Sequence, residues 1–253
     1  MLSEERRRKI VELVQRDGRV MVRDLGRRFS TSLITIRKDL EHLHQRGLIH
    51  RAHGGALPVD AAAQLDPTLH EKERLHRREK SRIALAAAKL IRPGQVIILD
   101  SGTTSTAVAR AIRHIPDLTV ITNAVNIAAD LAGTSVEVIL TGGTLRKNSF
   151  SLVGPIAEDS LRHVSADMLF LAVDGFDVQY GLTTPNQLEA RVNRAMIESA
   201  KTTVVVCDSS KFGKRSLSLI APTSSVQHAI TDRKIGSRDL RALRECGVRV
   251  IVA

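Results

Sequence analysis

The sequence contains few aromatic residues and few cysteines, and both shortages exclude classes of protein. Among its 253 residues there is no Trp, one Tyr and five Phe. Few flat side chains are therefore available for stacking unpaired bases, which counts against binding of single strands by RRM- or OB-type domains. The two cysteines, Cys207 and Cys246, form no CxxC pair. Isolated thiols of this kind favour a reducing compartment, in which Cys behaves as a small hydrophobic residue.

Metal-binding motifs and long apolar runs are also missing. The sequence has no HExxH motif and no Cys/His cluster, and His42 and His44 would face different sides of a helix. Neither a metal site nor a cofactor is therefore predicted. No run approaches the roughly 18 apolar residues of a membrane-spanning helix, and residues 1–9 are charged rather than apolar. We expect a cytoplasmic protein with no membrane partner.

Positive charge is abundant and unevenly distributed. The chain has 38 Lys and Arg against 27 Asp and Glu, a formal net charge of +11, and residues 1–56 hold 13 basic and 7 acidic side chains. Such a density of cations indicates a polyanionic partner, because neutralised phosphates release condensed counterions. Duplex DNA is the leading candidate. The length allows two domains, and the polar, Ala-rich stretch from Pro58 to Pro67, which has no periodicity, marks the boundary. We therefore expect a DNA-binding domain over 1–57, a linker over 58–70 and a larger domain over 71–253.

The first 57 residues are predicted to form three short helices and a hairpin. Apolar spacing predicts an amphipathic helix over 4–17 and a second helix over 22–29. Ser32 is a suitable N-cap for a third helix, which Gly47 would end. A strand and a Gly-Gly turn then suggest a hairpin wing, so that the module is typical of a winged helix-turn-helix. The residues expected to face its core are Ile10, Leu13, Val14, Val22, Leu25, Phe29, Ile36, Leu40 and Leu43.

The first turns of the third helix present the candidate DNA-binding face. Arg and Lys can donate to guanine or phosphate, hydroxyls can bond base edges, and an exposed Ile can pack on a thymine methyl group. The alternative is an ordinary solvated helix face with a capping Ser. The candidate residues are Ser32, Ile34, Thr35, Arg37 and Lys38 on the helix, with Arg51 and His53 on the wing.

These motifs resemble the DNA-binding domain of DeoR-family bacterial repressors. The similarity is carried by Arg8-Lys9-Ile10, Val22-x-Asp24-Leu25, Ser32-x-x-Thr35-Ile36-Arg37-x-Asp39-Leu40 and the stretch from Arg51 to Ala56. Two positions depart from the family pattern: His53 stands where an aromatic residue often precedes the two glycines, and Gly26 stands where the second helix usually has Ala.

The larger domain begins with a predicted helix over 71–90, which we interpret as a solvated basic face; a contact to DNA or to a second copy is the alternative. From Val96 onward, short apolar strands alternate with helices, which indicates an α/β domain with a mostly parallel sheet. The expected strands cover residues 96–99, 119–122, 136–140, 166–173, 203–207, 229–231 and 248–252. Ligands of such sheets bind at the carboxyl ends of the strands.

The loops at those ends are rich in hydroxyls, glycines and charges. The first loop opens directly into a helix, whose free N–H groups and dipole favour an anion; the alternative is a Ser/Thr-rich cap that holds no ligand. The loop matches neither GxxxxGK[ST] nor GxGxxG, so no nucleotide is indicated. The combined loops suit a small polyhydroxylated phosphate ester. The candidate effector-binding residues are Asp100, Ser101, Gly102, Thr103, Thr104, Thr122, Asn123, Gly142, Gly143, Arg146, Asp174 and Lys211.

The resemblance continues through this half, which is similar to the DeoR-family sensor domain and to its AgaR-like subgroup. It implies a phosphorylated sugar or amino-sugar effector, a homo-oligomer (dimer or tetramer), and repression of a carbohydrate operon that the effector relieves. It leaves open whether the chain activates instead, and whether the effector releases or promotes DNA binding.

That sensor fold is related to ribose-5-phosphate isomerase, and Asp174 to Asp177 and Glu189 resemble its acidic motif and its general base. Glu189 therefore joins the candidate effector-binding residues, with a structural role as the alternative. Residues 175–200 contain no Lys, whereas the isomerase has one there. We therefore expect a binding site without turnover. The alternatives are a sugar-phosphate isomerase- or deaminase-like enzyme with an appended DNA-binding domain, and a DNA-architectural protein with no effector.

Overall fold

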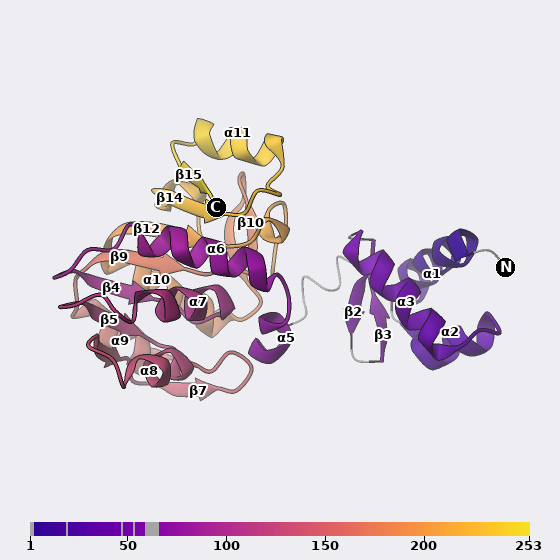
Figure 1. Ribbon diagram of the computed structural model, residues 1–253, viewed down its shortest axis with the longest axis horizontal. Helices are drawn as coiled ribbons and strands as arrows, with labels where there is room; N and C mark the ends of the chain where they lie inside the picture. Colours follow the sequence, from indigo (N-terminus) through magenta and orange to yellow (C-terminus); the bar gives the residue numbers. More distant parts are fainter. Residues whose placement is uncertain (1–2, 19, 47, 53, 59–65) are drawn as a thin grey trace. The chain divides into compact units, whose positions relative to one another are not determined.

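The computed structural model describes residues 3–18, 20–46, 48–52, 54–58 and 66–253. Gly47 and His53, expected to end the third helix and to lie on the wing, fall outside these residues. The chain separates into two compact units, Met1–Leu65 and Asp66–Ala253. Figure 1 follows both units along the chain.

The N-terminal unit is built from short helices and a small antiparallel sheet. Its described helices are α1 (Ser3–Asp17), α2 (Val22–Arg28) and α3 (Leu33–Gln45), and its described strands, in the order β1-β3-β2, are β1 (Val20–Met21), β2 (His50–Ala52) and β3 (Gly55–Leu57). Strands β2 and β3 pair as the predicted hairpin, and β1 adds a strand that the sequence did not predict. The expected core residues are buried, apart from Phe29, which is partly buried against them. The winged helix-turn-helix prediction is confirmed.

The second unit contains a parallel sheet of seven described strands in the order β15-β14-β12-β9-β4-β5-β6. Every pairing between these strands is parallel. The strands are β4 (Val96–Leu99), β5 (Thr119–Thr122), β6 (Glu137–Leu140), β9 (Ala166–Leu171), β12 (Ala200–Val206), β14 (His228–Thr231) and β15 (Arg249–Val252). The predicted α/β class with a mostly parallel sheet is therefore confirmed.

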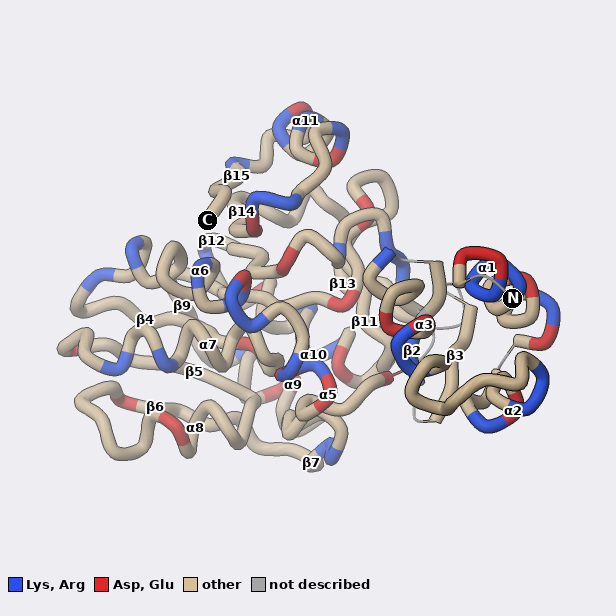
Figure 2. The backbone as a smooth tube through the Cα atoms, turned by 45° about the vertical axis from the view of Figure 1, so that its right-hand side comes forward, with Lys and Arg blue, Asp and Glu red and all other residues tan. Residues whose placement is uncertain are grey.

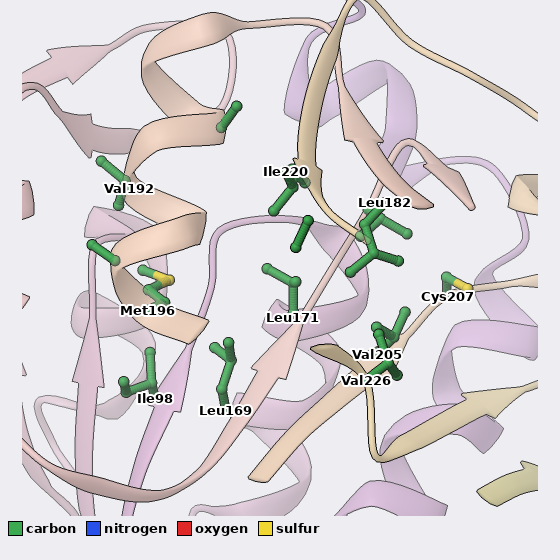
Figure 3. Packing of buried hydrophobic residues seen from close by; sticks show 14 of the residues in the cluster. Ile98, Leu169, Leu171, Leu182, Val192, Met196, Val205, Cys207, Ile220 and Val226 are labelled. Carbon is green, nitrogen blue, oxygen red and sulfur yellow. The ribbon is translucent and has the colours of Figure 1, made fainter. Parts of the chain in front are cut away.

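Alternate residues of the central strands enter two different cores. Ile98, Leu169 and Leu171 contribute to one cluster, which Figure 3 shows together with Val192 and Met196. Their strand neighbours point to the opposite face, where they pack against helices α6, α7 and α8. Both faces of the sheet are covered, which is why the strands read as continuous apolar runs. The covering helices are α6 (Arg77–Ala88), α7 (Thr103–Ile112) and α8 (Val125–Leu131) on one side, and α9 (Pro155–Arg162), α10 (Gln187–Glu198) and α11 (Ser237–Glu245) on the other.

The prediction of a single helix over residues 71–90 is wrong. The chain forms a short helix, α5 (Leu69–Glu73), and then α6, with His76 between them in the left-handed region at φ 52°. The buried ammonium of Lys80 donates to the carbonyl oxygens of Lys72 (2.6 Å) and Leu75 (2.8 Å). It satisfies carbonyls left free where α5 ends, so the break is stabilised by a contact that apolar spacing does not report.

Two small antiparallel sheets extend beyond the parallel sheet. One pairs β7 (Thr144–Arg146) with β8 (Ser151–Val153), and the other has the order β10-β11-β13, with β10 (Gly175–Asp177), β11 (Gly181–Thr184) and β13 (Ser218–Ala221). One-turn 3-10 helices cover Ser209–Lys211 and Thr223–Ser225. These short elements were not predicted. In the described residues no helix is long and apolar enough to cross a bilayer.

Candidate functional site

Helix α3 begins at a side-chain cap. The hydroxyl of Ser32 accepts a hydrogen bond from the backbone N–H of Thr35 (3.1 Å), and the two hydroxyls lie 2.9 Å apart. The predicted N-cap is therefore present. Because Ser32 is also exposed, its hydroxyl retains access to a partner outside the protein.

The face of α3 opposite the core is cationic and partly apolar. Ile34 is 64% exposed. Arg37 and Lys38 are exposed, and neither has an ion pair with another residue in the part of the chain that the structure describes. Leu33, at 39% exposure, adds a second apolar side chain to the start of the helix. Figure 2 marks the further Lys and Arg residues along α1 and α2 in blue.

A buried carboxylate fixes α3 to α1. Asp39 is 2% exposed and accepts hydrogen bonds from Arg6 Nε (2.6 Å) and Arg7 Nε (2.9 Å). The sequence motif that contains Asp39 does not by itself indicate this role. The signal was its place between Ile36 and Leu40, on the side of the helix that faces the core.

The wing residue Arg51 is held by a residue of α3. Its guanidinium donates to one carboxylate oxygen of Glu41, and the other oxygen accepts from Gln45 Nε2 (3.3 Å). An Arg51 contact to DNA therefore requires sharing or breaking the bond to Glu41. His53, the other wing candidate, lies outside the described residues.

The strand order of the second unit defines where a ligand site is expected. The chain runs from β4 outward through β5 to β6, then returns to β9 on the other side of β4. The carboxyl ends of β4 and β9 therefore flank the topological switch point of the sheet. Asp100 follows β4 directly, and Asp174 lies three residues beyond β9.

Helix α7 starts at this point without a side-chain cap. Its N-cap is Gly102 at φ 135°, a conformation that L residues rarely adopt, and a Cβ there would lie 3.1 Å from Ala172 Cβ. No side chain caps the first turn, formed by Thr103, Thr104 and Ser105. The N–H groups of that turn can therefore bind an anion.

Five of the predicted residues meet in one charged cluster with partners that the sequence did not reveal. Glu189 accepts hydrogen bonds from Arg146 (3.3 Å) and Ser151 (3.1 Å). The Thr184 hydroxyl lies 3.4 Å from both Asp174 Oδ2 and Glu189 Oε2. The cluster comprises Asp100, Arg146, Asp174, Glu189 and Lys211 with the additional residues Asp66, Lys72, Ser151 and Thr184.

The pKa values of two carboxyl groups in the cluster are displaced in opposite directions. Burial and the nearby Glu189 raise the pKa of Asp100 well above its ordinary value. Burial also acts to raise the pKa of Asp174, but Lys72 (2.8 Å) and Lys211 (3.5 Å) outweigh it and lower that pKa to about 2. Relative to a carboxyl group in water, the ionised form is therefore disfavoured at Asp100 and favoured at Asp174.

Four other predicted residues have structural roles. The Thr122 hydroxyl donates to Leu99 O (2.7 Å) and Asn123 Nδ2 donates to Leu152 O (3.2 Å). A Cβ on Gly142 would lie 2.7 Å from Ile156 Cγ2, and one on Gly143, at φ 124°, would lie 2.7 Å from Val153 O. These residues attach the β7–β8 hairpin and the strand ends to the rest of the unit.

Several buried polar atoms at the carboxyl ends of the strands lack a partner among the described residues. They include Ser105 Oγ, Asn123 Oδ1 and Thr141 Oγ1. Buried polar groups are rarely left unpaired in proteins, so these atoms indicate a place for water or a polar ligand. No group of three or more His, Cys, Asp or Glu that could hold a metal was found among the residues described.

The two units together define a regulator class, in which a winged helix unit for DNA is joined to an α/β unit with a polar ligand-type site. The family model of the DeoR-like helix-turn-helix domain matches residues 6–61, and that of the DeoR C terminal sensor domain matches residues 75–233. The chain belongs to the DeoR family, and it is a DNA-binding transcriptional regulator.

Full-length relatives support this assignment. The chain is 42% identical over 252 residues to a protein of Escherichia coli O157:H7 named as an aga operon transcriptional repressor, covering 99% of this chain and 94% of that one. It is 40% identical to the HTH-type transcriptional regulator GlpR of Haloferax volcanii, covering 99% and 98%. The glycerol-3-phosphate regulon repressor of E. coli K12 is 34% identical, covering 92% of each chain. These relatives are named as regulators of transcription.

Among solved structures, the fold is similar to a ribose 5-phosphate isomerase from Plasmodium falciparum. The TM-score is 0.40, with 14% identity over 53% of this chain and 52% of that one.

Proposed function

We propose that this protein is a cytoplasmic repressor of a carbohydrate or amino-sugar operon, and that a phosphorylated sugar controls its binding to the operator. Operators bound by winged helices are read by pairs of recognition helices, so the acting form is a homo-oligomer with an even number of chains. The names of the relatives, which refer to the aga operon and to glycerol-3-phosphate, support this reading.

The DNA contact is carried by α3. Its exposed start combines Arg37 and Lys38, two cations with no ion pair to another described residue, with the exposed apolar side chain of Ile34. Cations next to an apolar group match a major groove edge, where guanine acceptors and thymine methyl groups alternate. A purely solvated helix face gives no reason for Ile34 to be exposed beside them.

The effector contact rests on one observation: cations and carboxylates gather at the switch point beside the uncapped start of α7. The N–H groups of that helix, with Arg146 and Lys211, suit the dianion of a phosphate ester. The carboxyl groups of Asp100 and Asp174 suit sugar hydroxyls, and the ionised Asp174 suits the ammonium group of an amino sugar. A ligand with both a phosphate and several hydroxyls would contact the cationic groups and the carboxyl groups of the cluster together.

Control follows from linkage between the two sites. An effector that binds one arrangement of the oligomer better than another shifts the population toward it, and a coupling of about 1 to 3 kcal/mol is sufficient for regulation. We propose that the effector-bound arrangement no longer matches the half-site spacing of the operator. Catalysis is not part of this proposal, because Glu189 is engaged by Arg146 and Ser151 and residues 175–200 contain no Lys.

The DNA contact is tested by measuring operator affinity of the full chain at fixed salt. Arg37→Ala should weaken binding to a specific operator by about 1 to 3 kcal/mol and relax its sequence preference. Arg16→Ala removes the same charge from α1, at an exposed residue paired with Asp17, and should change affinity much less. Equal losses in the two variants would show that only general charge matters, as in a DNA-architectural protein.

The effector contact is tested by thermal unfolding against a panel of sugar and amino-sugar phosphates, with each unphosphorylated sugar as control. A ligand at 100 times its Kd adds about 2.7 kcal/mol of apparent stability. Arg146→Gln should abolish the shift, whereas Arg162→Gln, at an exposed residue of α9, should retain it. Conversion of an aldose phosphate to a ketose phosphate in the same samples would favour the enzyme alternative.

A further inference from the structure

The first residues of the second unit lie against the charged cluster. We call residues 66–75, which include α5, the strap. In sequence, the strap directly follows residues 59–65, the last residues of the N-terminal unit.

The strap is attached through backbone and apolar contacts at its centre. Leu69 is buried, and its N–H donates to the carbonyl oxygen of Asn148 (2.6 Å) on the β7–β8 hairpin. His70 contacts the ring of Phe150 edge-on, with 5.6 Å between the centroids. A capping box between Thr68 and Glu71 starts α5.

Charged contacts attach the strap at its first residue, Asp66, and at Lys72 within α5, and their partners belong to the proposed effector site. Asp66 forms an ion pair with Arg146, whose guanidinium also reaches Glu189. Lys72 forms an ion pair with Asp174 (2.8 Å). Arg146 and Asp66 have 13% and 25% of their side-chain surface exposed, so the pair is only partly screened by water.

The pair of Asp66 and Arg146 has a consequence for an anionic ligand. The guanidinium of Arg146 contacts Asp66 through one terminal nitrogen and Glu189 through the other. Few of its N–H donors are therefore left for a phosphate. A phosphate dianion carries more charge than one carboxylate and offers more acceptor oxygens, so it competes for the same nitrogens.

We propose that Asp66 is an internal competitor of the effector: it occupies Arg146 in the free protein, and a bound phosphate ester displaces it and loosens the strap. The inference rests on the proposed effector site and adds to it a segment, next in sequence to the N-terminal unit, whose attachment the effector changes. Coupling of the two events is reciprocal, so a change that frees Arg146 from Asp66 also strengthens phosphate binding.

The first test uses the full chain and inorganic phosphate as the probe, with sodium chloride at equal ionic strength as the reference. Asp66→Asn keeps the size of the side chain and removes its charge. It should raise phosphate affinity, measured by titration calorimetry, by about threefold to tenfold, because Arg146 is no longer occupied by a carboxylate. Asp159→Asn makes the same charge change at an exposed residue of α9 and should leave the affinity within twofold of the wild type. Equal affinities for the two variants would overturn the inference.

The second test follows hydrogen exchange of the Leu69 amide, which reports whether the strap is docked. Phosphate should speed this exchange in the wild type, and Asp66→Asn and Arg146→Gln should each speed it without phosphate. Phosphate binding that leaves the exchange unchanged would overturn the inference while leaving the proposed function intact. Failure of the wild type to bind phosphate or any phosphate ester of the panel would overturn both.

Discussion

Replacing Asp39 by Ala tests whether ion pairs to α1 hold the recognition helix in place. The carboxylate is 2% exposed and accepts bonds of 2.6 and 2.9 Å from Arg6 and Arg7. A hydrogen bond between charged groups contributes about 1.5 to 3 kcal/mol. The two arginines have 11% and 24% of their side-chain surface exposed and rehydrate in the variant, which reduces the loss. We expect the N-terminal unit to be destabilised by about 2 to 4 kcal/mol.

Such a loss is large for a unit of this size. In domains of about 60 to 100 residues, each kcal/mol lowers Tm by about 4 to 8 °C. Calorimetry of the full chain should therefore show the transition of the N-terminal unit lowered by about 10 °C or more, with the transition of the second unit unchanged. Hydrogen exchange of the α3 amides should accelerate in parallel, and operator affinity should fall as the folded fraction falls.

The matched control is Asp24→Ala in the same unit. Its carboxylate is 66% exposed and lies 3.3 Å from Arg27, so its removal should change stability by less than about 0.5 kcal/mol. Arg6→Ala should have an intermediate effect, because Asp39 keeps its bond to Arg7. If Asp39→Ala were no more damaging than Asp24→Ala, the buried ion pairs would not be what fixes α3.

Three further predictions concern the second unit. Phe170→Ala empties a fully buried site in the core and should lower the free energy of unfolding by about 3 to 5 kcal/mol, read from the urea midpoint. Gly181→Ala places a Cβ 2.3 Å from a carbonyl oxygen at φ 111° and should cost at least about 1 kcal/mol, whereas Gly133→Ala, in open space, should be nearly neutral. The pKa of Asp174 is lowered from 3.8 to about 2, so its ionised form should stabilise the unit by about 2 kcal/mol above pH 4. This stabilisation should be lost as the pH falls toward 2. Asp174→Asn should therefore flatten that part of the profile of stability against pH. A pH profile unchanged by this substitution would contradict the ion pairs of Asp174.

Local patterns in the sequence predicted most of the regular elements. The i, i+3, i+4 spacing of Ile10, Leu13 and Val14 lies within α1, and Ser32 caps α3 as expected. The short apolar runs became the strands of the parallel sheet. These features follow from residues that are neighbours along the chain, since the helical and strand periods are properties of the local backbone.

The candidate site was predictable only in part. The carboxyl ends of strands bring Asp100 and Asp174 to one edge of the sheet by a general rule of the fold class. That rule does not distinguish ligand contacts from structural ones, and Thr122 and Asn123 proved to bond the backbone. The rule also gives no signal for Lys72, which lies in α5, before β4, the first strand of the parallel sheet in sequence.

The sequence by itself therefore determined the two-unit organisation, the class of each unit and the chemistry of the strand ends, because these depend on short-range periodicity and on residue type. The tertiary structure alone decided which distant residues meet. Asp39 pairs with α1 across more than 30 residues, and Arg146 joins Asp66 to Glu189 from opposite sides in sequence. Such pairings depend on the strand order and on how the helices pack against the sheet, and no periodic pattern in the chain records either.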